Sequence, residues 1–216
     1  MMFEDRADAG KKLAENLKAY KNKEAVVLAI PRGGLIVARE VSKLLNLPLS
    51  IIVVRKLGYP TQPEFGFGAI SEGNTIYLNK DTISSYPIDN SSIDIIIKNE
   101  KKELKRRIDV YRNGKKLPIL KNKSVILVDD GLATGASATA SILAVKKEKP
   151  KEIIFAVPVS AKDTSEKIKK EVNNFVCLIT DRNLFAIGNY YKNFDQVDDE
   201  AILKILRPKE EARTRI

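Results

Sequence analysis

Short apolar runs alternate with amphipathic stretches along most of the chain. The apolar runs end at polar or turn-forming residues, which predicts buried strands at 25–30, 49–54, 124–128, 152–159 and 174–180. Between them, apolar residues recur with the spacing of one helix face, which predicts helices at 5–21, 35–45, 92–112, 134–147 and 164–172, and a short one opened by Asp198. Strands and helices in this order form parallel strands joined by crossover helices. We therefore expect an α/β fold with a mostly parallel, doubly wound sheet.

One segment interrupts this alternation. Residues 55–68, RKLGYPTQPEFGFG, contain two prolines and three glycines, and a loop of that length inside a domain is commonly a functional lid or disordered. The pattern GAIS-EGN-TIYL after it predicts a hairpin turned at Gly73 and Asn74. We expect one domain, whose parts are a core at about 22–180, a flexible lid at 55–74, a C-terminal hood at 181–206 and a basic tail at 207–216.

Charge and length say little about the fold, but they bear on the kind of partner and on the cellular compartment. The 216 residues carry a formal net charge of +10, which fits a phosphate-rich partner, although a lysine-rich surface coat explains it equally well. The basic stretch 98–116 has the same two readings, a solvated face or a surface that meets nucleic acid. The longest apolar run is far shorter than the ~20 residues of a membrane span, and the polar N-terminus is unlike a secretory leader. We expect a cytoplasmic protein.

The residue inventory restricts the chemistry. The chain has no histidine and one cysteine, Cys177, which lies in an apolar strand-like run and is expected to pack. Mechanisms that need a histidine base, a Cys–His pair or a His/Cys zinc site are excluded. Carboxylates, lysines, arginines, tyrosines and backbone amides remain.

The most informative stretch is VILVDDGLATGAS, at residues 125–137. An apolar strand leads into Asp129 and Asp130, and small and hydroxyl residues follow up to a helix start. Free amides at a helix N-terminus attract a phosphate, and small residues let the backbone approach it. The lysine of a Walker loop is missing, which argues against a nucleoside triphosphatase of that type. The predicted phosphate-binding residues are Gly131, Leu132, Ala133, Thr134, Gly135, Ala136 and Ser137.

Two carboxylates beside a phosphate site require a different partner, because they repel phosphate. Vicinal ribose hydroxyls are donors that Asp129 and Asp130 can accept from. A sugar that carries a 5′-phosphate offers both kinds of group at a suitable separation. The motif therefore predicts a phosphorylated pentose as ligand.

The same motif resembles the signature of the type I phosphoribosyltransferases, in which an apolar strand, two acids and a Thr-Gly-x-Thr/Ser loop follow in order. The resemblance implies an enzyme of nucleotide metabolism that uses 5-phosphoribosyl 1-diphosphate (PRPP) and releases pyrophosphate. It also implies a homodimer, and Mg²⁺ held near Asp129 and Asp130, directly or through water. Asp129, Asp130 and Arg32 would be catalytic. The pyrophosphate would be bound by Arg32, Gly33, Gly34, Arg55 and Lys56.

The acceptor is implied by the loop after the last strand, LFAIGNYYKNF, which resembles the hood of 6-oxopurine phosphoribosyltransferases. By this resemblance a base, of which a purine is one candidate, would contact Phe185, Ile187 and Lys162. The sequence departs from those enzymes at three places. Ala133 and Lys192 stand where they carry acids, and the purine-reading lysine aligns nearest to Ala161, one position before Lys162.

Two other functions fit parts of the sequence. A PRPP-sensing regulator would keep the pocket and bind nucleic acid through its basic helix, although no helix-turn-helix pattern is evident. A relative of the diphosphate synthases would need a kinase-like nucleotide site, which the sequence does not reveal. A small-molecule substrate with no membrane and no nucleic acid partner is the expectation that we carry forward.

Overall fold

The computed structural model describes residues 2–206. Its centre is a five-stranded sheet in the order β2-β1-β6-β7-β8, and every neighbouring pair is parallel. The strands are β1 (Ala25–Ala29), β2 (Leu49–Ile51), β6 (Ser124–Val128), β7 (Glu152–Ala161) and β8 (Asn174–Asp181). Because all five run the same way, the loops that follow them gather at one edge. The predicted doubly wound α/β fold is confirmed.

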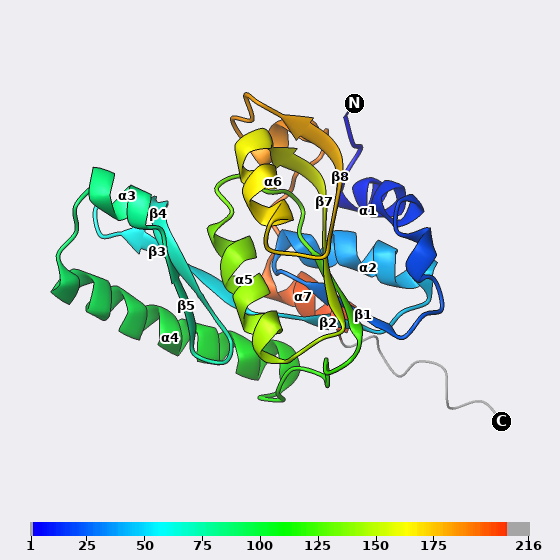
Figure 1. Ribbon diagram of the computed structural model, residues 1–216, viewed down its shortest axis with the longest axis horizontal. Helices are drawn as coiled ribbons and strands as arrows, with labels where there is room; N and C mark the ends of the chain where they lie inside the picture. The colour runs from blue at the N-terminus through cyan, green and yellow to red at the C-terminus, as the bar shows by residue number, and fades with distance from the viewer. Residues whose placement is uncertain (1, 207–216) are drawn as a thin grey trace.

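Helices cover both faces of this sheet (Figure 1). The strand β6 shows why, since Val125 and Leu127 join one buried cluster and Ile126 and Val128 join the other. The first cluster includes α5 (Ala136–Lys147) and α6 (Lys162–Lys169), and the second includes α1 (Arg6–Glu15) and α2 (Gly33–Leu45). A strand buried on both faces is apolar throughout, which is how the sequence revealed it.

A second, antiparallel sheet of β3 (Val54–Tyr59), β4 (Gln62–Ser71) and β5 (Thr75–Leu78) stands beside the parallel one. Figure 1 shows it projecting to one side, with α3 (Lys80–Ser85) at its outer end and the long α4 (Asn90–Arg112) running along it. The side chain of Asp89 caps α4 by accepting from the amide of Ser92, and Asn113 ends the helix in the left-handed conformation. The predicted hairpin turn is confirmed, since Gly73 and Asn74 both have positive φ.

The expectation of a loop at residues 55–68 is wrong. These residues form β3 and most of β4, joined at a tight turn where Tyr59 pairs with Gln62. The glycines serve close backbone approach, because a Cβ at Gly58 would lie 2.1 Å from the carbonyl oxygen of Pro63, and one at Gly68 would lie 2.3 Å from that of Tyr77. Composition alone suggested a loop, but cross-strand pairing determined the structure.

The N-terminal residues pair with the segment that follows β8, the last strand of the parallel sheet. The amide of Phe3 donates to the carbonyl of Tyr190 (2.8 Å), and the amide of Lys192 donates to that of Phe3 (2.8 Å). The predicted hood segment contains a 3₁₀ helix (Ile187–Tyr190) and α7 (Asp199–Leu206). The N-terminal residues therefore pack together with the predicted hood segment, 181–206. The predicted basic tail, 207–216, lies outside the described residues.

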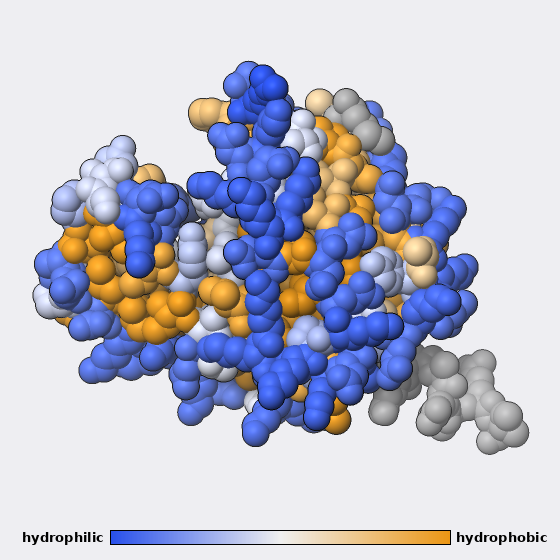
Figure 2. All heavy atoms as spheres, viewed as in Figure 1, coloured by the Kyte–Doolittle hydropathy of each residue, from blue (hydrophilic) through white to orange (hydrophobic). Residues whose placement is uncertain are grey.

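The visible face of the molecule is largely charged, with apolar areas between the charged side chains (Figure 2). Figure 2 shows hydrophobic atoms gathered over the small sheet, where Ile76 on β5 is 38% exposed. Among residues 2–206 no helix combines the length and apolarity that crossing a bilayer requires.

Candidate functional site

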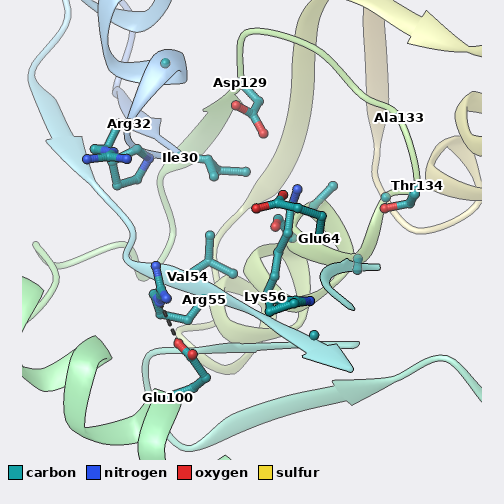
Figure 3. Close-up of a pocket in the computed structure, with 18 of the residues that line it drawn as sticks. Ile30, Arg32, Val54, Arg55, Lys56, Glu64, Glu100, Asp129, Ala133 and Thr134 are labelled. Carbon is teal, nitrogen blue, oxygen red and sulfur yellow. Dashed lines mark hydrogen bonds and ion pairs between the residues drawn. The ribbon is translucent and has the colours of Figure 1, made fainter. Parts of the chain in front are cut away.

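A pocket of about 680 Å³ lies between the carboxyl edge of the parallel sheet and the small sheet. Its walls come from the turn after β1, the hairpin of β3 and β4, one face of α4 and the loop after β6. It holds all of the predicted phosphate-loop residues, and Figure 3 shows its labelled side chains. Segments far apart in the sequence therefore form one site.

The loop after β6 is hydrogen-bonded to β7 at its start and offers backbone amides toward its end. Leu132 exchanges backbone hydrogen bonds with β7, accepting from Ala161 (2.8 Å) and donating to Val159 (2.9 Å). Gly135 has a φ of 81°, and a Cβ there would lie 2.7 Å from Thr164. Within residues 2–206 the amides of residues 133–135 donate to no other group, so the loop offers free donors just before α5 begins at Ala136.

The two acids differ in their surroundings. Asp129 projects from the end of β6 toward the pocket (Figure 3), and its Oδ1 accepts from the amide of Asp130 at 2.8 Å. Removal from water, together with the charge of Asp130, raises the pKa of Asp129 well above the ordinary value for aspartate. Asp130 instead forms an ion pair with Arg6, whose Nε lies 2.7 Å from Oδ2.

The sequence did not indicate Arg6. It is 8% exposed although charged, its Nη1 donates to the carbonyl of Asp195 at 2.8 Å, and its guanidinium lies 3.7 Å from the centre of the Phe194 ring. Arg6 and Asp130 are 124 positions apart, so no local pattern could have connected them.

The PRGG turn lies directly against the acid pair. A Cβ at Gly33 would sit 1.8 Å from Oδ2 of Asp130, and one at Gly34 would sit 2.8 Å from Cα of Asp129. Glycine is therefore required at both positions for the acids to stay where they are. Arg32 lines the pocket and is partly exposed, and its nearest carboxylate is that of Asp199, at 3.9 Å.

Arg55 and Lys56 reach the pocket from β3. Arg55 donates from Nε to Glu100 of α4 at 2.6 Å, which Figure 3 marks with a dashed line, and Lys56 is exposed. The inner face of α4 also contributes Ile96, Asn99 and Arg107. These residues recur at helical spacing in the sequence, but the basic composition of the helix favoured an interpretation based on its solvent face.

The predicted base contacts are only partly brought together. Ile187 lines the pocket and lies so close to Gly131 that a Cβ there would be 2.5 Å from the isoleucine side chain. Phe185 is 93% exposed and Lys162 begins α6, and neither is among the residues that line the pocket. Their roles in base binding stay predictions. Lys192 pairs with Glu4 at 2.6 Å.

Cys177 is half-buried in β8, where burial raises the pKa of its thiol. A thiol in that state is a poor nucleophile. The packing role expected from the sequence agrees with its place against the cluster that contains α5.

A doubly wound domain with a free-amide loop at the carboxyl edge of its parallel sheet has the architecture in which phosphate-bearing ligands are commonly bound. The sequence model of the phosphoribosyl transferase domain matches residues 3–193, and the chain belongs to that family. The family predicted from the motif is confirmed.

Relatives agree with this assignment. The chain is 38% identical over 205 residues to a candidate phosphoribosyl transferase of Mycobacterium tuberculosis, covering 95% of this chain and 46% of that protein. It thus spans about half the length of the curated relatives that it matches. The solved structure of the protein TT1426 from Thermus thermophilus is 37% identical, with a TM-score of 0.79 over 95% of this chain and 98% of that one. A purine phosphoribosyltransferase from Pyrococcus horikoshii, 22% identical, shares the fold with a TM-score of 0.51 over 89% of each chain.

Proposed function

We propose that the protein transfers the 5-phosphoribosyl group of PRPP to a nitrogenous base. One observation carries the proposal. Asp129 and Asp130 line the same pocket as the free amides of residues 133–135. The amides would hold the 5′-phosphate and the carboxylates would accept from the ribose hydroxyls.

In the reaction, a base nitrogen uses its lone pair to form a bond with C1 of the ribose. The bond from C1 to pyrophosphate oxygen breaks, pyrophosphate leaves with the bonding electrons, and the base proton passes to solvent. Positive charge grows on the ribose ring as the leaving group departs. Asp129 and Asp130 would stabilise it, because fixed charges in a site shielded from water act strongly on a developing charge.

Pyrophosphate would be received by cations on two sides of the pocket. Arg32 has its closest carboxylate partner at 3.9 Å and can turn toward a ligand. Arg55 would exchange Glu100 for pyrophosphate oxygens, which suit its forked donors. Lys56, exposed at the pocket wall, would add a third charge.

The donor set also fits Mg²⁺. This ion is commonly held by one or two carboxylates together with substrate phosphates, and Asp129 and Asp130 are two adjacent carboxylates at the pocket. Among the described residues no cluster of three or more acidic, cysteine or histidine side chains forms a complete protein site. When bound, the ion would neutralise charge on the pyrophosphate leaving group.

The acceptor that we propose is a purine, stacked near Ile187. This isoleucine and Ile30 supply apolar surface on the pocket wall. A base would approach C1 from that side, and Phe185 would contact it only after the hood moves. We also propose that the enzyme works as a homodimer in nucleotide metabolism.

A second candidate rests on α4. Lys98, Lys101, Lys102 and Lys105 are exposed and recur at the spacing of one helix face. Such a stripe can bind phosphates of nucleic acid. The protein would then be a PRPP-binding regulator with little transferase activity.

A base screen separates these functions. The protein is incubated with PRPP, Mg²⁺ and single free bases, and pyrophosphate release is measured. Release with a purine, lost in Asp129→Asn/Asp130→Asn and kept in the exposed control Asp94→Asn, supports the transferase. PRPP binding without release on any base, together with salt-sensitive binding of nucleic acid that fails in a Lys101→Gln/Lys105→Gln variant, supports the regulator.

A further inference from the structure

Arg6 occupies an unfavourable place for a cation. It is the first residue of α1, where the helix dipole favours negative charge, and it is 8% exposed. Burial of an unpaired charge is costly, so partners elsewhere must hold it. Its side chain contacts residues that are all distant in sequence, namely Asp130, Asp195 and Phe194.

The ion pair with Arg6 fixes one carboxylate from behind. Nε of Arg6 donates to Oδ2 of Asp130 at 2.7 Å, and Gly33 closes the other side, since a Cβ there would lie 1.8 Å from that oxygen. The carboxyl of Asp130 also interacts with the neighbouring carboxyl of Asp129. Arg6 therefore anchors Oδ2 while Asp130 lines the pocket.

We propose that Arg6 is a positioning residue that orients Asp130 to accept a ribose hydroxyl of the substrate. The inference rests on the proposed function and adds a residue to it. Arg6 also places a positive charge beside the two acids, which reduces their repulsion of a substrate that carries several phosphates. An arginine suits this place because its fork reaches Asp130 and the Asp195 carbonyl at once.

The test is the affinity for PRPP with Mg²⁺, measured by titration calorimetry on folded variants. Arg6→Gln should weaken binding about 10- to 100-fold, the range found when an outer-shell partner of a metal ligand is removed, because Asp130 is one of the two carboxylates that would hold Mg²⁺. Arg6→Lys should recover part of the loss, because it restores the charge but not the fork. Lys11→Gln, an exposed substitution on the same helix, should bind as the wild type does.

A purely structural role of Arg6 would act through the C-terminal segment. Phe194→Leu removes the ring that lies over the guanidinium without touching the ion pair. We expect it to keep the wild-type affinity. An affinity loss in Phe194→Leu as large as that in Arg6→Gln would overturn the inference.

The decisive measurement is a double-mutant cycle with Asp130→Asn. If Arg6 acts through Asp130, Arg6→Gln should weaken binding in the wild-type background and change it little in the Asp130→Asn background. Equal factors in both backgrounds would contradict the inference while leaving the proposed function intact. Should Arg6→Gln fail to fold, Arg6→Lys completes the same cycle. A wild-type protein that binds no PRPP would overturn the proposed function and this inference together.

Discussion

The ion pair between Glu72 and Arg112 anchors the small sheet that carries Arg55 and Lys56. Glu72 lies in the turn before β5 and Arg112 at the end of α4, and both side chains are 8% exposed. Glu72 also accepts from the amide of Val53 at 2.8 Å, next to the start of β3. Loss of this pair should therefore destabilise the wall of the pocket that the hairpin forms.

The perturbation is Arg112→Met, which keeps most of the side-chain volume and leaves Glu72 buried without its cation. Breaking a buried pair in this way costs about 3–5 kcal/mol, against a total stability of roughly 5–15 kcal/mol. At about 2–4 °C per kcal/mol for a domain of this size, the melting temperature should fall by roughly 6–20 °C. The matched control is Lys169→Met, whose pair with Glu166 is about half-exposed and is worth about 0.3–0.5 kcal/mol.

The stability lost in Arg112→Met should depend on pH. Burial raises the pKa of Glu72 even in the presence of Arg112, so the folded state binds the proton more tightly than the unfolded chain does. The stability that the protonated Glu72 contributes is present below its unfolded pKa of 4.5, and it is lost as the pH rises through the pKa of Glu72 in the folded state. Removal of Arg112 should raise the folded pKa further, so the variant should lose more stability at pH 8 than at pH 5.

Urea unfolding followed by circular dichroism at both pH values measures the effect. A loss in Arg112→Met no larger than that in Lys169→Met, or a loss that is the same at pH 5 and pH 8, would refute the reasoning. Glu72→Gln with Arg112→Met should recover much of the stability, because replacing both charges removes the buried ion.

Three further results are expected. Because the pKa of Asp129 is raised, kcat/KM should fall on the acid side at a pH above 3.8, the ordinary value for aspartate; a profile that stays flat down to that pH would argue against an essential carboxylate there. Gly131→Ala should push Ile187 away, since the added Cβ would lie 2.5 Å from it; steady-state kinetics should show a raised KM for the base, and an unchanged KM for the base would move the base site elsewhere. Cys177 should react slowly with a thiol reagent at pH 7 until the protein is unfolded, because burial raises its pKa; fast labelling of the native protein would contradict the packing role.

Much of the parallel core could be predicted from sequence because its strands are buried on both faces. Runs such as 124–128 are apolar at every position but one, and the acids that end them mark the edge where ligands bind. The helix expected at 5–21 ends at Glu15 and continues only as a 3₁₀ turn (Lys18–Tyr20), since amphipathic spacing does not fix where a helix stops.

The missed features depend on contacts between distant segments. The hairpin of β3 and β4 was hidden by its prolines and glycines, whose close approaches appear only when the strands pair. The helix α3 is held by Tyr59, whose hydroxyl donates to the carbonyl of Tyr86 at 2.6 Å, a link that composition does not indicate. Arg6 was missed for the same reason, because it acts on Asp130, which is distant in the sequence, and not on its sequence neighbours.

The central claim is that amides after β6 hold the phosphate of a sugar whose ring hydroxyls meet the two acids. The most direct test is a crystal structure of the protein with PRPP and Mg²⁺. We expect the 5′-phosphate within hydrogen-bonding distance of the backbone amides at residues 133–137 and the ribose hydroxyls on Asp129 and Asp130. Density for the ligand outside this pocket, or a phosphate on Arg32 with the pentose turned away from both acids, would contradict the claim.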